Sequence, residues 1–373
     1  MDFAMFSRDL PPAAPGRGTT MRSLRRAVQE VRAGAPVVLD GPDPLLLLAI
    51  ETASEAGLAE FQALSSAGAL LLLAPSRAAA IMGGAGPDGP AAAAVALRVP
   101  DAALTVATLE ALADPTQGNT VTPGWTKAPP QAGAALLLAK LARLLPAMLA
   151  APLQTQPDQG VLRVAARDLI AHRAAPFDTL VRAAEAVVPL AEAEDARLVA
   201  FRPEDGGTEH LAILIGRPED AAAPLVRIHS ECFTGDLLGS MRCDCGAQLH
   251  HAIRSMAAEG AGVLLYMAQE GRGIGLVNKL RAYALQDAGL DTLDANRALG
   301  FAADERSFGA AAVMLKGLGI RRVRLLTNNP DKLAGLEASG IEVAGRVSLS
   351  IAANGVNDGY LETKARRFGH LLE

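Results

Sequence analysis

Cysteine is scarce in this chain, with only three among 373 residues. All three lie between residues 232 and 245, and the rest of the sequence has none. An odd number of closely spaced cysteines argues against a disulfide framework and is typical of a reducing compartment, where such a cluster is more often a metal site or a set of reactive thiols. We therefore expect a cytoplasmic protein whose chemistry lies near these thiols.

The chain also lacks a strong excess of one charge and any long uninterrupted hydrophobic run. Its formal net charge is −5, so neither nucleic acid nor a membrane surface is expected as a partner. The most apolar stretch, residues 134–151, contains Lys140, Arg143 and Pro146 and falls short of the ~20 apolar residues that a spanning helix needs. The first residues carry acids and prolines where a signal peptide has a basic end and an apolar run, so no leader is expected.

The length of 373 residues suffices for two domains at ~100–200 residues each. In both halves short apolar runs alternate with helical patterns, which is typical of an α/β or α+β fold, with a mixed sheet and packed helices in each domain. We predict a flexible arm over residues 1–20, a first domain over 21–160, a linker over 161–177 and a second domain over 178–373. The stretch between residues 35 and 160 has no histidine or cysteine, so a general base or metal site is hard to assemble there.

The apolar patterns also predict individual elements. In the first domain we expect strands at 35–40, 69–74 and 95–99 and helices at 45–56 and 134–149. In the second domain we expect strands at 197–201, 210–215, 225–229, 262–267, 322–327 and 341–347. The helices expected there are 247–259, 276–288 and 307–318.

The spacing Cys232-x10-Cys243-x-Cys245 is the strongest local signal. Three thiolates can hold zinc at ~2.3 Å each and leave a fourth tetrahedral position for water or substrate, as in a catalytic zinc site. The alternatives are a closed structural site with His229 as fourth ligand, or three ordinary buried thiols. A Cys-x-Cys pair cannot form the paired Cys-x2-Cys knuckles of a zinc ribbon, which favours the catalytic interpretation.

Three further polar clusters follow the cysteines. Residues 269–275 form a glycine-rich strand-to-helix turn that can present N–H groups to phosphate, although Glu270 and Arg272 also suit a solvated ion pair. Residues 304–306 are expected at the start of a helix, where acidic side chains also occur simply because they cap the helix and compensate its dipole. Residues 327–332 follow a strand at its carboxyl end, where ligands bind in open α/β sheets, although Asn-Asn-Pro is also common in turns. Together the clusters indicate hydrolysis of a phosphorylated, nucleotide-like substrate at a metal-bound water.

The segments RIHSECFTGD, RCDCGAQL, QEGRGIGL, DER and LLTNNP stand in this order between residues 227 and 330. In content and order they resemble the GTP cyclohydrolase II family, and the similarity extends over about residues 178–373. The resemblance implies zinc-dependent hydrolysis of GTP to 2,5-diamino-6-(5-phospho-ribosylamino)pyrimidin-4-one, formate and pyrophosphate. That reaction is the first step of riboflavin biosynthesis and is performed by a hydrolase acting on cyclic amidine C–N bonds. The resemblance also implies one zinc ion per chain, magnesium with the triphosphate, and a homodimer.

Roles carry over from the resemblance residue by residue. The zinc ligands would be Cys232, Cys243 and Cys245. Asp304 would accept a proton and Arg306 would attack the α-phosphate, with an electrostatic role as the rival because arginine stays protonated. Tyr283 would lie near the ring-opening chemistry, with packing on a helix face as the alternative. The positions that would contact GTP are Arg227, Ile228, His229, Ser230, Glu231, Gln248, Glu270, Gly271, Arg272, Thr292, Thr327 and Lys332.

The first half resembles the 3,4-dihydroxy-2-butanone 4-phosphate synthase domain of bifunctional members, through LRRAVQEVRAGAPVVLD at its opening and VAARDLIAHR at its junction. It lacks the D-D-E-D-R-E-N-E-type cluster that this synthase needs for magnesium and sugar phosphate. We therefore predict a degenerate, non-catalytic domain that serves structure or dimer formation. In the second domain Ala268 stands where many members have an arginine, which removes a basic side chain beside the site.

The sequence is also compatible with two other functions. One is a paralogue that opens the ring without releasing formate, or that acts on another nucleotide; the presence of Tyr283 speaks against the former. The other is a non-catalytic nucleotide-binding zinc protein.

Overall fold

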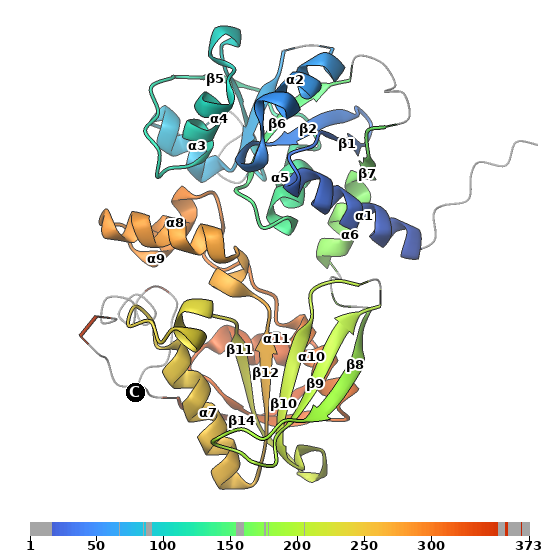
Figure 1. The fold of residues 1–373 in the computed structure, drawn as a ribbon, viewed down its shortest axis with the longest axis vertical. Helices are drawn as coiled ribbons and strands as arrows, with labels where there is room; N and C mark the ends of the chain where they lie inside the picture. Colours follow the sequence, from blue (N-terminus) through green and yellow to red (C-terminus); the bar gives the residue numbers. More distant parts are fainter. Residues whose placement is uncertain are drawn as a thin grey trace, which may run out of the picture.

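The computed structural model describes residues 17–66, 68–84, 86, 92–153, 160–174, 177, 179–204, 206–349, 355–356 and 367. Within these ranges the chain forms two seven-stranded mixed sheets, each with packed helices (Figure 1). The predicted fold class is therefore confirmed. Most of the predicted N-terminal arm lies outside the described residues, and its last four residues, 17–20, begin a helix instead.

The first sheet has the strand order β5-β4-β3-β6-β2-β1-β7. Its strands are β1 (Val37–Asp40), β2 (Leu45–Ala49), β3 (Leu70–Leu73), β4 (Val95–Arg98), β5 (Gly124–Thr126), β6 (Ala147–Pro152) and β7 (Arg163–Ala165). The helices of this half are α1 (Arg17–Arg32), α2 (Glu55–Leu64), α3 (Pro75–Met82), α4 (Val106–Ala113), α5 (Ala132–Leu141) and α6 (Ala166–Ala174). Only β1 and β7 pair in parallel; the other neighbours are antiparallel.

Two helices predicted in the first half are wrong in extent. Residues 45–49 form the strand β2, and every residue of that strand is buried. The predicted helix 134–149 is divided into α5 and β6 by a turn in which Arg143 has a φ of 58°. A continuous apolar run suits a buried strand as well as a buried helix, and hydrophobic periodicity alone does not separate the two.

The segment predicted as a linker, residues 161–177, contains β7 and α6. β7 pairs in parallel with β1 at the edge of the first sheet, and Arg163 on β7 forms an ion pair with Asp40 on β1. Residues 163–165 are therefore part of the first sheet. The polar run of six residues before it, 154–159, lies outside the described residues.

The second sheet has the order β14-β13-β11-β12-β10-β9-β8. Its strands are β8 (Leu180–Val187), β9 (Arg197–Pro203), β10 (His210–Gly216), β11 (Leu225–Ser230), β12 (Ala261–Met267), β13 (Arg322–Leu326) and β14 (Glu342–Val347). The helices of this half are α7 (Cys245–Glu259), α8 (Leu276–Asp287), α9 (Thr292–Ala298), α10 (Gly309–Gly317) and α11 (Pro330–Ala338). In the described part of the chain, no helix combines the length and hydropathy that crossing a membrane requires.

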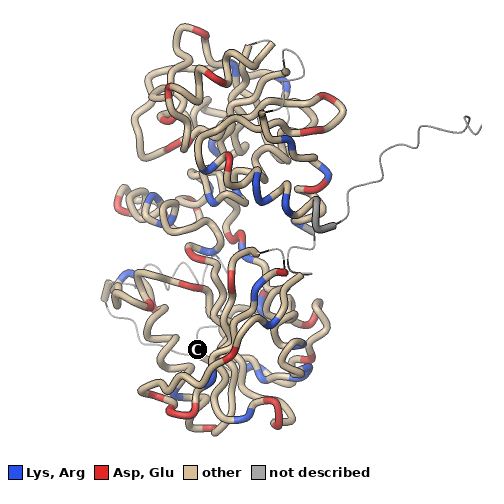
Figure 2. The backbone as a smooth tube through the Cα atoms, turned by 45° about the vertical axis from the view of Figure 1, so that its right-hand side comes forward, with Lys and Arg blue, Asp and Glu red and all other residues tan. Residues whose placement is uncertain are grey.

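The helices α8 and α9 lie between the two sheets (Figure 1). They pack against the first half, because Ala282, Leu285 and Leu299 belong to the same buried apolar cluster as strand residues of the first sheet, such as Leu48 and Leu149. Figure 2 shows Lys, Arg, Asp and Glu residues close together where the two halves meet. The helices α8 and α9 therefore extend the core of the first half, whereas the second sheet packs around two buried apolar clusters of its own.

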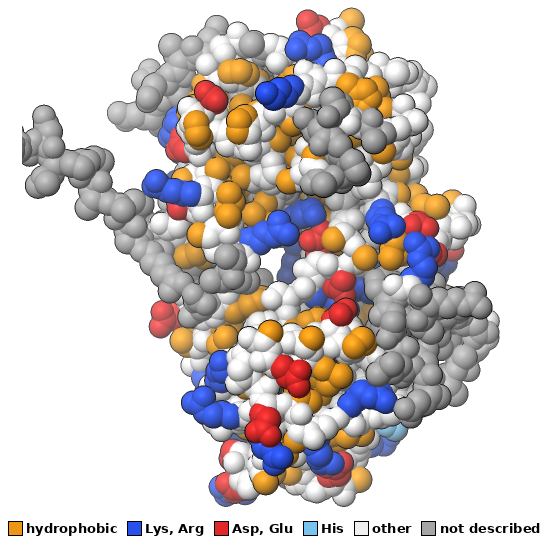
Figure 3. All heavy atoms as spheres, turned by 180° about the vertical axis from the view of Figure 1, so that it is seen from behind, with side chains coloured by type: hydrophobic (Ala, Val, Ile, Leu, Met, Phe, Trp, Pro, Cys, Tyr) orange, Lys and Arg blue, Asp and Glu red, His pale blue; other side chains and the backbone are white. Residues whose placement is uncertain are grey.

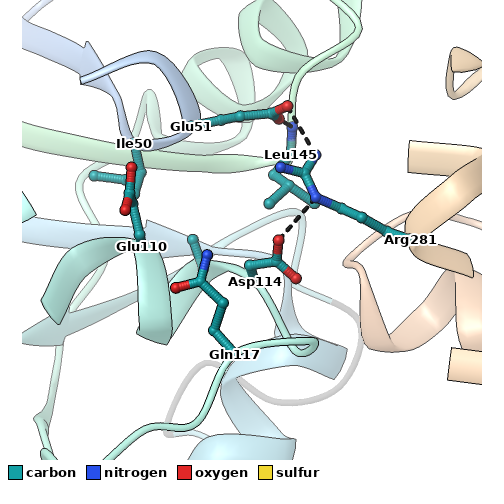
Figure 4. A pocket seen from close by; sticks show the side chains of 8 residues that line it. Ile50, Glu51, Glu110, Asp114, Gln117, Leu145 and Arg281 are labelled. Carbon is teal, nitrogen blue, oxygen red and sulfur yellow. Dashed lines mark hydrogen bonds and ion pairs between the residues drawn. The ribbon is translucent and has the colours of Figure 1, made fainter. Parts of the chain in front are cut away.

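Arg281 on α8 forms the most buried ion pairs where the two halves meet. Its Nη1 donates to Glu51 Oε1 at 2.7 Å, and its Nε donates to Asp114 Oδ2 at 2.8 Å (Figure 4). Glu51 also accepts a hydrogen bond of 2.6 Å from the Leu145 N–H. A small pocket beside these groups is lined by Ile50, Glu51, Glu110, Ala113, Asp114, Gln117, Leu145 and Arg281.

Replacing Arg281 with alanine should lower the free energy of unfolding by about 3 kcal/mol, because it leaves two largely buried carboxylates without their cation. The measurement is denaturant unfolding followed by far-ultraviolet circular dichroism and by the fluorescence of Trp125, the only tryptophan. The matched control is Arg254→Ala, which removes an ion pair of 2.9 Å whose arginine side chain is 58% exposed. That control should cost less than about 1 kcal/mol; equal losses in the two variants would contradict a stabilising role of Arg281.

Candidate metal and nucleotide site

The predicted site residues gather at one edge of the second sheet. β11 runs parallel to both β12 and β13, so the carboxyl ends of the three strands point to the same side. The segments that follow them, residues 231–245, 268–275 and 327–332, are those in which the sequence analysis placed most of its candidates. Such an edge is where ligands bind in open α/β sheets.

The three thiols are brought together by two elements. Cys232 follows β11, while Cys243 and Cys245 stand at the start of α7. All three sulfur atoms lie within 4.8 Å of one another, and the Sγ atoms of Cys232 and Cys243 are 3.7 Å apart. Ligands at 2.3 Å on a tetrahedron are about 3.8 Å apart. The chemistry and spacing of these donors therefore fit zinc.

The turn between the cysteines depends on Gly235. A Cβ atom on this residue would lie 2.8 Å from Cys243 Sγ and 3.0 Å from Cys232 Sγ. Any larger side chain would displace the thiols.

His229 does not act as a fourth ligand in this arrangement. Its Nε2 lies 3.0 and 3.1 Å from the two carboxylate oxygens of Asp236, and its ring stacks on Tyr266 with 5.6 Å between centroids. Among the described residues, the one group of three or more potential metal-ligating side chains consists of the cysteines alone. A closed four-ligand structural site is therefore less well supported than a site with an open position.

Asp236, which the sequence analysis did not single out, organises this turn. Besides His229, its carboxylate accepts hydrogen bonds from the Cys232 N–H at 3.0 Å and from the Tyr266 hydroxyl at 2.9 Å. Burial lowers the pKa of His229 despite the hydrogen bond to Asp236, which favours the neutral imidazole. The sequence signal that could have identified Asp236 is its position at the end of the segment ECFTGD.

Lys279 on α8 is a second residue that sequence reasoning missed. Its Nζ donates to Cys232 Sγ at 3.0 Å, to Thr234 Oγ1 at 3.0 Å and to Glu270 Oε1 at 2.8 Å. Burial lowers its pKa, but the hydrogen bonds to Glu270 and Cys232 outweigh this and raise it. Hydrogen bonds with Cys243, Cys245 and Lys279 lower the pKa of Cys232 despite its burial. A lysine on an amphipathic helix gives no sequence signal for such a contact.

The Glu270 carboxylate fixes the start of the glycine-rich turn. It accepts from the Phe233 N–H at 2.6 Å and from the Gly271 N–H at 2.8 Å, in addition to Lys279. Gly271 and Arg272 both adopt left-handed backbone, with φ of 63° and 61°. The glycine suits this conformation, whereas the arginine adopts a rare one. Glu270 is therefore a buried support of the loop that carries Arg272 and not a solvated surface carboxylate.

A second group of candidates lies deeper at the same edge. Arg227 donates from Nη1 to the Leu326 carbonyl at 3.0 Å and from Nη2 to Gln248, and burial lowers its pKa to about 10 against the opposing effect of Asp244. Lys332 Nζ donates to the Ile228 carbonyl at 2.7 Å. Two buried cations thus lie at the carboxyl ends of β11 and β13.

Asp304 and Arg306 form a multiple ion pair on a loop. Arg306 Nε donates to the carboxylate oxygens of Asp304 at 2.9 and 3.1 Å, and its Nη1 donates to Ser230 Oγ at 3.2 Å. Burial raises the pKa of Asp304, but the hydrogen bonds and charge of Arg306 lower it overall. The predicted helix start is wrong here, because α10 begins only at Gly309. The side-chain pair, rather than helix capping, holds the loop against the end of β11.

Of the remaining candidates, most lie at the same edge. Tyr283 on α8 faces the cysteine turn, with Arg242 Cζ 5.1 Å and Lys279 Nζ 5.8 Å from its ring centre. Thr327 accepts from the Asn329 N–H at 3.0 Å just after β13. Thr292 begins α9 and accepts from Gln286 at 3.3 Å, and among the described residues it bonds to no other candidate.

The chain is similar in sequence to several known proteins. A family model described as GTP cyclohydrolase II matches residues 181–348. A GTP cyclohydrolase-2 from Azospirillum brasilense is 46% identical over 382 residues, which cover 98% of each chain. One from Actinobacillus succinogenes is 51% identical over 191 residues, covering 51% of this chain and 88% of its own. The riboflavin biosynthesis protein RibBA of Parabacteroides distasonis is 47% identical over 206 residues, covering 55% and 51%.

Solved structures resemble the chain more weakly. RibBX, a two-domain 3,4-dihydroxy-2-butanone 4-phosphate synthase from A. baumannii, covers 88% of this chain and 99% of its own at 17% identity and a TM-score of 0.33. The relative from Azospirillum brasilense, in contrast, matches both halves from end to end at 46% identity. On this ground the chain belongs to the GTP cyclohydrolase II family.

Proposed function

We propose that the chain catalyses zinc-dependent hydrolysis of GTP to 2,5-diamino-6-(5-phospho-ribosylamino)pyrimidin-4-one, formate and pyrophosphate, the first step of riboflavin biosynthesis. The observation that carries this proposal is the group of three thiols, with sulfur atoms within 4.8 Å of one another, at the sheet edge that also bears the Asp304–Arg306 pair. Cys232, Cys243 and Cys245 would hold zinc. When bound, zinc supplies a Lewis acid that lowers the pKa of coordinated water from 15.7 to about 7.

The protein's own residues would bind and orient the nucleotide. Arg227, Arg306 and Lys332 place three cations at the carboxyl ends of the strands, where they suit a triphosphate accompanied by magnesium. Asp304 would be the proton acceptor. The hydrogen bonds and charge of Arg306 lower the pKa of Asp304, which keeps its carboxylate ionised but also makes it a weaker base than an isolated carboxylate. Tyr283 faces the cysteine turn and would stand beside the opening ring.

The ion pair favours an electrostatic role for Arg306 over a covalent one. Its guanidinium donates to both oxygens of a carboxylate and to Ser230, and each of these contacts stabilises the protonated form. A protonated guanidinium has no free lone pair for attack on phosphorus. It can instead stabilise the negative charge that develops on the phosphate oxygens.

For the first half we propose a degenerate 3,4-dihydroxy-2-butanone 4-phosphate synthase-like domain without its own activity, covering residues 21–160. Leucines occupy the stretch where that synthase carries acids, and Leu45–Leu48 are buried in β2. We also propose a cytoplasmic homodimer. The support for a dimer is a set of exposed apolar side chains on the cysteine turn and α8: Phe233, Leu237, Leu238, Met241, Val277 and Leu280.

The reaction is tested by incubating the full-length protein with GTP, zinc and magnesium. Formate and pyrophosphate should appear in equal amounts, and mass spectrometry should show the diaminopyrimidine product. Ring opening without formate would support a paralogous activity instead. Zinc bound in stoichiometric amount with GTP left intact would contradict the proposal and favour a non-catalytic nucleotide-binding protein.

A further inference from the structure

We propose that Arg143, a residue of the first domain, is part of the nucleotide site of the second domain and binds the phosphates of the substrate. The inference rests on the proposed function and deepens it, because it assigns a binding role to a domain that has lost the acidic cluster of its own site. It follows from where the turn between α5 and β6 meets the glycine-rich turn.

Arg143 contacts both ends of the glycine-rich turn. Its Nη2 donates to the Ala268 carbonyl at 3.0 Å, just after β12. Its own carbonyl accepts from Asn278 Nδ2 at 3.2 Å, at the start of α8. A Cβ atom on Gly275 would lie 3.2 Å from the Arg143 Cβ, so the two backbones approach closely. The guanidinium therefore lies beside the loop that carries Glu270 and Arg272.

The backbone of Arg143 points to a role for its side chain. Among the described residues, Arg143 and Arg272 are the two non-glycine residues with positive φ, at 58° and 61°. Glycine adopts this conformation without strain, whereas residues with a side chain adopt it rarely. Such outliers cluster at ligand-binding sites. Here one outlier belongs to the proposed GTP-binding loop and the other donates a hydrogen bond to that loop.

The charge of Arg143 reaches the sheet edge. His210 accepts a hydrogen bond of 3.1 Å from the Ala268 N–H, and burial followed by the charge of Arg143 lowers the pKa of His210 to about 4. The peptide groups of Ala268 are thus held by one side chain from each domain. The side chain of Ala268 carries no charge. The positive charge beside this residue comes from Arg143, which donates to the Ala268 carbonyl.

A second contact joins the first domain to the catalytic loop. Lys140 Nζ lies 2.5 Å from Glu305 Oε1, and Glu305 stands between Asp304 and Arg306 in the chain. The Glu305 N–H donates to the Arg272 carbonyl at 3.1 Å. In Figure 3, basic and acidic side chains both border the hollow between the two halves. Lys140 and Arg143 are thus two first-domain cations bonded to loops of the proposed site.

The test uses the full-length, metal-loaded protein and three variants. Arg143→Gly removes the guanidinium and keeps the left-handed backbone available, Arg143→Lys keeps the charge, and the double variant R143G/A268R restores a guanidinium on the residue to which Arg143 bonds. Losing a charge-assisted contact should raise the KM for GTP about 10-fold in Arg143→Gly, with kcat changed less than about 3-fold. Arg143→Lys and the double variant should recover most of this loss.

The control is Arg98→Ala, which removes an exposed first-domain arginine at the end of β4; its KM should equal that of the unchanged protein. An unchanged KM in Arg143→Gly would overturn the proposal. So would a raised KM that neither the lysine nor the A268R variant recovers, since the contact would then serve structure alone. If the unchanged protein hydrolyses no GTP, the proposed function fails by itself. Equilibrium dialysis with GTP then tests Arg143, with a 10-fold weaker Kd expected in Arg143→Gly.

Discussion

Replacing Cys243 with serine should abolish zinc binding and lower kcat for GTP by more than about 10³-fold, because a metal lowers the pKa of water by about nine units and two thiolates hold it poorly. Cys243 and Cys232 have sulfur atoms 3.7 Å apart, so the loss of either thiol opens the triad. Metal content by mass spectrometry and kcat should fall together. The chain has three cysteines in all, so a thiol titration reports on this cluster alone.

The control for this variant is Ser255→Ala on α7. Ser255 bonds to the His251 carbonyl within the same helix that Cys245 begins. Metal content and kcat should be unchanged in the control. The catalytic metal site would be refuted if Cys243→Ser lost zinc and kept its activity. A variant that kept zinc but lost activity would require a different ligand set.

Replacing Arg306 with alanine should lower kcat by about 10²–10³-fold with zinc retained, since the variant loses a preorganised cation at the phosphates. It also frees Asp304, whose carboxylate is held by Arg306 at 2.9 and 3.1 Å. Arg306→Lys should keep part of the activity, because a lysine supplies the charge but not the forked geometry. Single-turnover kinetics with GTP would measure these losses directly.

Arg322→Ala is the matched control for the arginine variants. Arg322 also pairs with a carboxylate, that of Glu342 at 2.7 Å, but it is exposed at the amino end of β13 and should leave kcat unchanged. Partial activity in Arg306→Lys supports electrostatic stabilisation. Isolation of a guanylyl adduct on Arg306, lost in both variants, would instead establish covalent catalysis.

The accuracy of the sequence predictions differs between the halves. In the second half the strands and helices carry polar breaks between them, and the expected strand at 262–267 and helix at 276–288 correspond to β12 and α8 within about one residue. In the first half long runs of alanine and leucine have few polar breaks, so the pattern predicts helix for the residues that form β2 and β6. These residues form strands and not helices because β2 and β6 pair with each other in the middle of the first sheet.

The sequence by itself determined the thiol triad and the order of the polar segments, because the three cysteines lie close together in the chain and each segment follows an apolar strand. Only the tertiary structure decided what surrounds them. Lys279 is 47 residues from Cys232, and Arg143 is 125 residues from Ala268, yet each donates a hydrogen bond there. The physical reason is that parallel strands gather distant segments at one edge, and helix α8 packs against both halves. Contacts of this kind leave no local pattern in the sequence.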